Sequence, residues 1–156
     1  MAILKPLVII NGQIQQLPTG DTIEGQNLTV DLTENDATGT PKVTPVYVDS
    51  PGTYKQAKAD AAATKNVLGF TTAAVSSGGT GTIQLEGIIE AATGDWDAVT
   101  GDVGGLTAGS KYYLDPDTVG MITDNPPTTD ADYVCPLGEA ISTTKFRIDI
   151  DATVLL

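Results

Sequence analysis

The chain has 156 residues, of which 20 are acidic and eight are basic, so its formal net charge at pH 7 is −12. Such a charge repels the phosphates of nucleic acids and of anionic membranes, and we expect neither as a partner. The sequence contains no histidine. This excludes Ser-His triads, Cys-His dyads and imidazole metal sites.

The N-terminal stretch reads as a separate apolar arm. Residues 7–10 are a β-branched run, Asn11-Gly12 is typical of a two-residue hairpin turn, and residues 13–17 follow as a second short strand. The run is too short for a signal peptide or a membrane span. An isolated hairpin is marginal in water, so we expect the arm to lie on its own domain or on a neighbouring subunit.

The rest of the chain carries what reads as two related β-units, about residues 39–89 and 105–150. Gly39-Thr40-Pro41 and Tyr47-Val48-Asp49 recur 66 residues later as Gly105-Leu106-Thr107 and Tyr113-Leu114-Asp115. Further landmarks are the turn glycines at 52 and 120, Leu-Gly at 68–69 and 137–138, and the strands ending at 86 and 149. The alternative is coincidence, since such short motifs occur in many all-β chains.

Many short strands with Gly and Pro punctuation predict an all-β fold, a sandwich or barrel of short antiparallel strands. We place the extended arm and a polar linker at residues 1–35 and the β-domain at 36–156. The only helical feature that we predict is one turn over residues 61–63, which Asp60 could cap. A closing hairpin is expected over residues 134–141 and 145–150.

Trp96, the only tryptophan, lies between two aspartates in a turn-rich stretch between the units. It fits either a local core under a long loop or an interface anchor, because tryptophan is enriched at binding hot spots. With the apolar residues of the arm, it completes the candidate partner interface: Leu4, Leu7, Val8, Ile9, Ile10, Ile14, Leu17 and Trp96.

Nothing in the sequence predicts catalysis, a cofactor or a metal site. Cys135 is the only cysteine; between Val134 and Pro136 it reads as a buried small hydrophobe. The stretch 115–120 alternates acidic residues like a calcium loop, but it lacks the terminal Glu of an EF-hand and Pro116 with Gly120 already makes a turn. The Gly-rich segments 78–81 and 101–105 lack the context of a phosphate loop. We therefore predict that the protein is not an enzyme.

Several motifs together resemble small structural proteins of tailed bacteriophages. The opening, residues 5–18 with Gly20-Asp21, is similar to the start of many such proteins. Four further patterns resemble the same group: residues 96–101, Gly-Leu-Thr-x-Gly-x-x-Tyr-Tyr-Leu at 105–114, Gly-x-Ile-Thr at 120–123, and residues 134–142. The resemblance covers nearly the whole chain.

The resemblance implies a β-rich virion protein, usually a trimer, without catalytic residues. Because the chain is short and acidic, we expect a capsid decoration (cement) protein on the outer surface of a phage head, made in the host cytoplasm. Its partners would be the major capsid protein and neighbouring copies of itself in a homotrimer. The alternative within the virion is a tail-fibre or tail-tip module, and a more remote alternative is a metal-dependent hydrolase.

Overall fold

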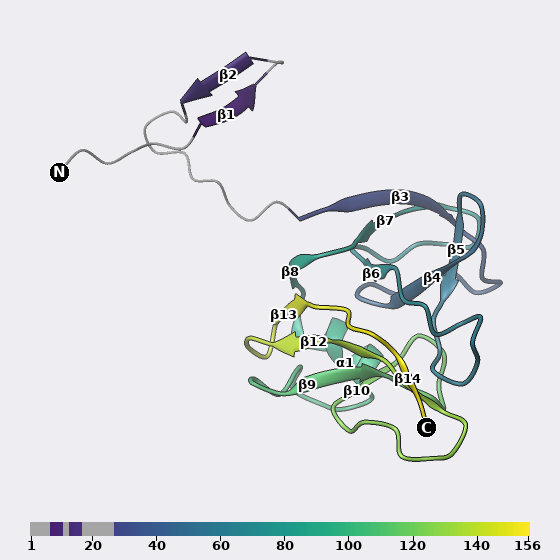
Figure 1. The fold of residues 1–156 in the computed structure, drawn as a ribbon. Helices are drawn as coiled ribbons and strands as arrows, with labels where there is room; N and C mark the ends of the chain where they lie inside the picture. Colours follow the sequence, from purple (N-terminus) through teal and green to yellow (C-terminus); the bar gives the residue numbers. More distant parts are fainter. Residues whose placement is uncertain (1–6, 11–12, 17–26) are drawn as a thin grey trace.

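A computed structural model describes residues 7–10, 13–16 and 27–156, and this part of the chain is all-β apart from one short helix (Figure 1). The predicted fold class is confirmed. In chain order the elements are β1 (Leu7–Ile10), β2 (Gln13–Gln16), β3 (Thr29–Glu34), β4 (Pro45–Ser50), β5 (Thr53–Gln56), β6 (Gly69–Thr71), β7 (Thr80–Gln84), β8 (Gly87–Glu90), α1 (Thr93–Thr100), β9 (Lys111–Leu114), β10 (Ile122–Thr123), β11 (Tyr133–Val134), β12 (Pro136–Ala140), β13 (Lys145–Ile148) and β14 (Val154–Leu155).

The first unit is a closed barrel in the order β3-β5-β4-β6-β7, and we call it the barrel unit. Its neighbouring strands are antiparallel except for β3 and β5, whose ends pair in parallel at Thr33↔Thr53 and Glu34↔Tyr54. This short parallel ladder closes the barrel, and it departs from the purely antiparallel arrangement that the sequence predicted. A small core of Val46, Tyr54 and Ile83 fills the interior.

The second unit is an open antiparallel sheet in the order β10-β9-β12-β13-β8, and we call it the sheet unit. After Glu90, at the end of β8, the chain forms α1. The equivalent strand of the barrel unit, β3, instead continues as a strand to Glu34. Because a helix takes this place, β8 and β10 do not pair with each other and the sheet stays open. A separate two-stranded ladder joins β11 to β14 near the C-terminus.

The two units share one strand order, as the repeated landmarks predicted. Reading β3, β7, β6, β4 and β5 across the barrel corresponds to reading β8, β13, β12, β9 and β10 across the sheet. The registers correspond as well: Val46↔Gly69 in the barrel matches Tyr112↔Gly138 in the sheet. Likewise, Val30↔Ile83 in the barrel has its counterpart in the sheet pair formed by β8 and β13 (Ile89↔Phe146).

Equivalent glycines in the two units meet equivalent obstacles. A side chain at Gly69 would run into the carbonyl oxygen of Gln84, and one at Gly138 would run into that of Arg147. Gly39 and Gly105 both have positive φ, 76° and 83°, a conformation that favours glycine. The short motifs of the sequence therefore mark positions where both units need the same backbone.

Several predicted boundaries were wrong. Strand β3 lies in the part of the chain assigned to the arm and linker, yet it closes the barrel. Strand β8 was placed in the first unit, whereas it is the edge strand of the sheet unit. The units as observed span residues 29–84 and 87–148. Val30 and Leu32 alternate with polar residues in β3, but this local pattern does not show that the strand closes a barrel.

The predicted helical turn at 61–63 is an irregular turn, and the helix forms at α1 instead. The main-chain N–H of Ala92 donates to Asp95 Oδ2 at 3.2 Å, which holds the start of the helix. Gly101 ends it with φ 77°, in the left-handed conformation of a helix cap. The sequence offered a weak signal, because only Trp96 and Val99 of its eight residues are buried.

The outer surface of the barrel unit packs on the inner side of the sheet unit, so the two share one core. Phe70 on β6 lies with its ring centroid 5.5 Å from that of Phe146 on β13. Trp96 of α1 and Tyr112 of β9 approach the same Phe146 ring at 5.7 Å and 6.1 Å. All four side chains are buried, so the open side of the sheet is covered by the barrel and by the helix.

Candidate functional site

The two strands of the predicted arm, β1 and β2, pair with each other antiparallel. Its register places Leu7 opposite Gln16 and Ile9 opposite Ile14. Five of the candidate interface residues (Leu7, Val8, Ile9, Ile10 and Ile14) therefore belong to these strands, whereas Leu4 and Leu17 lie outside the described residues. The pairing of the two expected strands is confirmed, whereas the turn predicted at residues 11–12 lies outside the described residues.

Trp96 is not a surface anchor. Its side chain is fully buried, and its indole Nε1 donates to the carbonyl oxygen of Thr144 at 3.1 Å. The structure corrects this part of the candidate interface, because the residue that the sequence allowed at a hot spot is part of the core. The reading as a local core under a long loop is the correct one, although the helix that carries Trp96 was not predicted.

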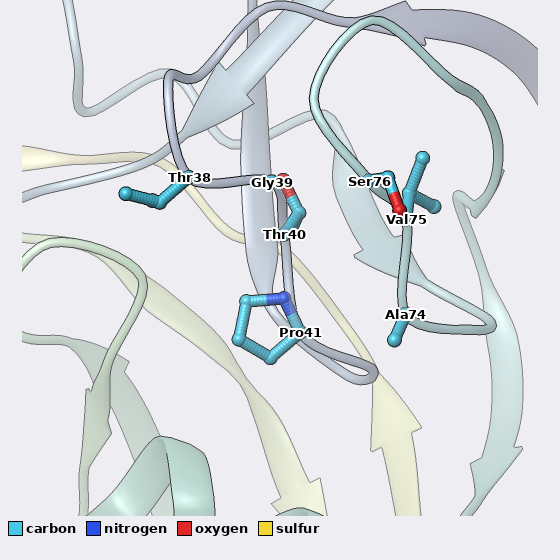
Figure 2. Close-up of a pocket in the computed structure, with 7 residues that line it drawn as sticks. All are labelled: Thr38, Gly39, Thr40, Pro41, Ala74, Val75 and Ser76. Carbon is cyan, nitrogen blue, oxygen red and sulfur yellow. The ribbon is translucent and has the colours of Figure 1, made fainter.

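A surface pocket of about 280 Å³ opens on the barrel unit between two segments, 38–41 and 74–76 (Figure 2). The segments are joined by a pair of main-chain hydrogen bonds between Thr40 and Val75, each 2.8 Å long. The pocket lining contains no charged side chain: Thr38, Gly39, Thr40, Pro41, Ala74, Val75 and Ser76. It has no acid, base or nucleophilic pair within it, so it offers a shape rather than chemistry.

A buried carboxylate lies behind this pocket. Glu34, only 1% exposed, accepts hydrogen bonds through Oε1 from Asp36 N at 2.7 Å and from Thr40 Oγ1 at 3.2 Å. Its Oε2 accepts from Gly78 N at 3.2 Å. The one side chain thus ties both pocket-forming loops together, and its lone pairs are used by the protein itself. Sequence reasoning missed Glu34, which stands in a polar stretch that gave no sign of burial.

The remaining sequence candidates have structural roles. Asp115 Oδ1 accepts from the main-chain N–H groups of Asp117 and Thr118, each at 2.7 Å, which makes the stretch 115–120 a turn held by its own aspartate. Cys135 is 3% exposed, and burial raises the pKa of its thiol, which disfavours the thiolate. Among the residues that the structure describes, no group of three or more Cys, Asp or Glu side chains could hold a metal ion.

Comparison of the chain with models of protein families finds no match, and comparison with curated proteins finds no similar relative. Within the described residues, no helix is long and apolar enough to cross a membrane.

Asp36, beside the Glu34 site, gives a prediction about pH. Burial raises the pKa of its carboxyl, and the charges of Glu34 and Asp49 act in the same direction, against a hydrogen bond from Gln56 N at 2.8 Å. A raised pKa in the folded state means that ionisation of Asp36 costs stability as pH rises through that value, and that this cost is absent below its usual pKa of 3.8.

We therefore expect Asp36→Asn, which keeps an acceptor for Gln56, to melt at a higher temperature than the unmodified protein at pH 7. The difference in melting temperature should shrink as pH falls below 4, where Asp36 of the unmodified protein becomes protonated and is neutral like the asparagine that replaces it. Thermal denaturation at pH 7 and at pH 3.5 measures it. An equal melting temperature at pH 7 would show that the ionised Asp36 carries no such cost.

Proposed function

We propose that this protein is a non-enzymatic virion structural protein, a capsid decoration protein that binds the outer surface of a tailed-phage head and stabilises it. The observation that carries the proposal is the apolar hairpin β1–β2 ahead of an acidic β-body, by which we mean the barrel unit and the sheet unit together. Residues 6–20 contain no charged side chain, in a chain whose net charge is −12. This hairpin is the stretch best suited to bury itself in a partner.

The β-body supports the proposal as a compact scaffold. Its two units share a core that runs from Val43 in the barrel to Ile148 in the sheet, which suits a protein that must remain folded on a particle surface. An arm that adds strands to an exposed sheet edge would satisfy its backbone groups there, while its side chains fill pockets. Repetition over many sites would let modest contacts reinforce a shell through avidity.

Deletion of residues 1–20 tests the role of the arm. We expect the truncated protein to lose binding to heads that lack the native protein by at least tenfold, because the apolar strands are gone. We expect the β-body to keep its melting temperature, because its first barrel strand begins at Thr29, beyond the deleted residues. Co-sedimentation with the heads measures binding, and circular dichroism measures folding.

A matched pair of charge substitutions sharpens this test. Ile9→Asp places a carboxylate at an apolar position of β1, whereas Gln15→Asp places the same charge at a polar position of β2. If apolar contact of the arm drives binding, Ile9→Asp should weaken it much more than Gln15→Asp. Equal binding of the truncated and the full-length chain would refute the arm model.

The copy number in purified virions distinguishes a head protein from a tail protein. We expect an amount comparable to that of the major capsid protein, measured by quantitative mass spectrometry. A few copies per particle would place the protein in the tail, as a fibre or tip module. Its absence from the particle would overturn the virion role itself.

A further inference from the structure

One part of the outward face of the sheet unit carries more basic side chains than carboxylates, unlike the rest of this acidic chain. Side chains alternate between the two faces of a strand, so the partners of the buried residues point outward. The register aligns Lys111, Glu139, Arg147 and Ile88 in one row across β9, β12, β13 and β8, and Lys145 lies opposite Glu90 in the next. We call the surface made by these six residues the cationic face.

Three of the eight basic residues of the chain lie on the cationic face, against two carboxylates, so its local charge is +1. Arg147 Nη2 lies 3.1 Å from Glu139 Oε2, and Lys145 Nζ lies 3.5 Å from Glu90 Oε2. The side chains of Arg147 and Lys145 are about half exposed, 54% and 46%, and Ile88 is 48% exposed. Exposed isoleucine beside arginine is a composition suited to a protein contact.

The equivalent face of the barrel unit is already a packing surface within the chain. Glu139 and Arg147 correspond by register to Phe70 and Gln84. These two residues are 0% and 4% exposed, because this side of the barrel covers the sheet unit. These two positions of the repeated row are therefore covered in the barrel unit and uncovered in the sheet unit.

An acidic surface, opposite in charge to the cationic face, lies on another part of the molecule, where loops of both units meet. Lys58 Nζ lies 2.9 Å from Asp60 Oδ2, and the negative charges of Asp115 and Asp117 also act on this lysine. The main chain of Tyr133 donates to Ala59 O at 3.0 Å, which brings the loop that carries further carboxylates next to them. We call this surface the acidic loop end: Asp60, Asp115, Asp117, Asp130 and Asp132.

We propose that the cationic face binds the acidic loop end of a second copy of this chain. The two surfaces differ, so the contact is head-to-tail, and contacts of this kind close into rings when the rotation between copies allows it. The charge argument selects this occupant, since copies that carry −12 each repel one another everywhere else that carboxylates dominate. This inference rests on the proposed virion role only for the expectation that the ring is a trimer.

Charge reversal tests the contact with purified protein in solution. In 20 mM salt, we expect the full chain to self-associate in sedimentation equilibrium, and 500 mM salt to weaken the association because the contact is partly electrostatic. Lys145→Glu with Arg147→Glu should raise the dissociation constant at least tenfold. Asp117→Lys with Asp130→Lys should do the same from the other side.

The combination of all four substitutions in one chain should restore self-association, because each surface then meets its new complement. Restoration also shows that the separate variants did not fail by unfolding. Lys55→Glu reverses a single charge on the barrel, away from the cationic face, and as a control it should change the dissociation constant less than threefold.

A full chain that is monomeric in 20 mM salt would overturn the contact. So would a quadruple variant that does not recover self-association. Head binding without self-association would leave the proposed function standing and refute this inference alone. Self-association without head binding would do the reverse.

Discussion

Replacing Phe146 with alanine is expected to lower the free energy of unfolding by about 3–5 kcal/mol. The ring is fully buried where the barrel, the helix and the sheet meet, with Phe70, Trp96 and Tyr112 all within 6.1 Å between centroids. Its removal deletes a large apolar side chain and leaves a cavity that these three neighbours, held by different elements, cannot easily fill.

Chemical denaturation of the full chain measures this loss. Tyr113→Ala is the matched control, since Tyr113 is an aromatic residue of the same sheet that is only half-buried. We expect the control to cost less than about 2 kcal/mol, in the ordinary range for substitutions outside a core. A Phe146→Ala protein as stable as the control would show that the two units do not depend on this contact.

The same core predicts how the protein unfolds. Because one buried cluster includes residues of both units, the barrel and the sheet should lose structure in a single transition. Phe146→Ala would then shift one transition rather than separate two.

The duplicated unit was predictable because it rests on backbone requirements. Gly39 and Gly105 need a left-handed conformation, and Gly69 and Gly138 need an absent side chain, so glycine stands in the chain at each of these places. Each of these requirements fixes the residue type at a single position. The pairing of β1 with β2 was predictable from the Asn-Gly signal between them in the sequence.

The placement of elements that depend on contacts distant in sequence was not predictable. In β3, Val30 and Leu32 alternate with polar residues and favour a strand, but its place in the barrel follows from pairing with β7 some 50 residues later, for example Asp31↔Thr82. Helix α1 forms where the sheet unit would otherwise close, and Trp96 is buried by Phe146 from β13 rather than by its own neighbours in sequence. In both cases contacts between distant parts of the chain decide where the element lies.

The candidate interface shows the same division. Its arm residues follow from composition, because an uncharged apolar stretch is visible at once in an acidic chain. The cationic face could not be found in that way. Lys111, Glu139 and Arg147 are spread over 37 residues, and only the register of three strands brings them into one row.

Glu34→Ala is expected to destabilise the fold by about 3 kcal/mol, the second large effect that the structure predicts. The substitution leaves two donors without their acceptor, the N–H group of Asp36 and the hydroxyl of Thr40, both in the loop after β3. It also removes one of the two acceptors of Gly78 N, in the loop before β7, which keeps its bond to the main-chain oxygen of Glu34.

Glu34→Gln separates the role of hydrogen bonding from that of volume. The amide keeps the size of the side chain and one accepting oxygen, but its NH₂ group would face a donor, either Gly78 N or Asp36 N. We therefore expect a cost between those of Glu34→Ala and Asp31→Asn, a control on the same strand whose carboxylate is exposed and accepts from Thr82. Hydrogen exchange at the amide of Asp36, which donates to the Glu34 carboxylate, gives a local readout, and it should accelerate in Glu34→Ala and stay slow in the control. If exchange at this amide stayed slow in Glu34→Ala, the loops would be held by main-chain bonds such as those between Thr40 and Val75, and not by the buried carboxylate.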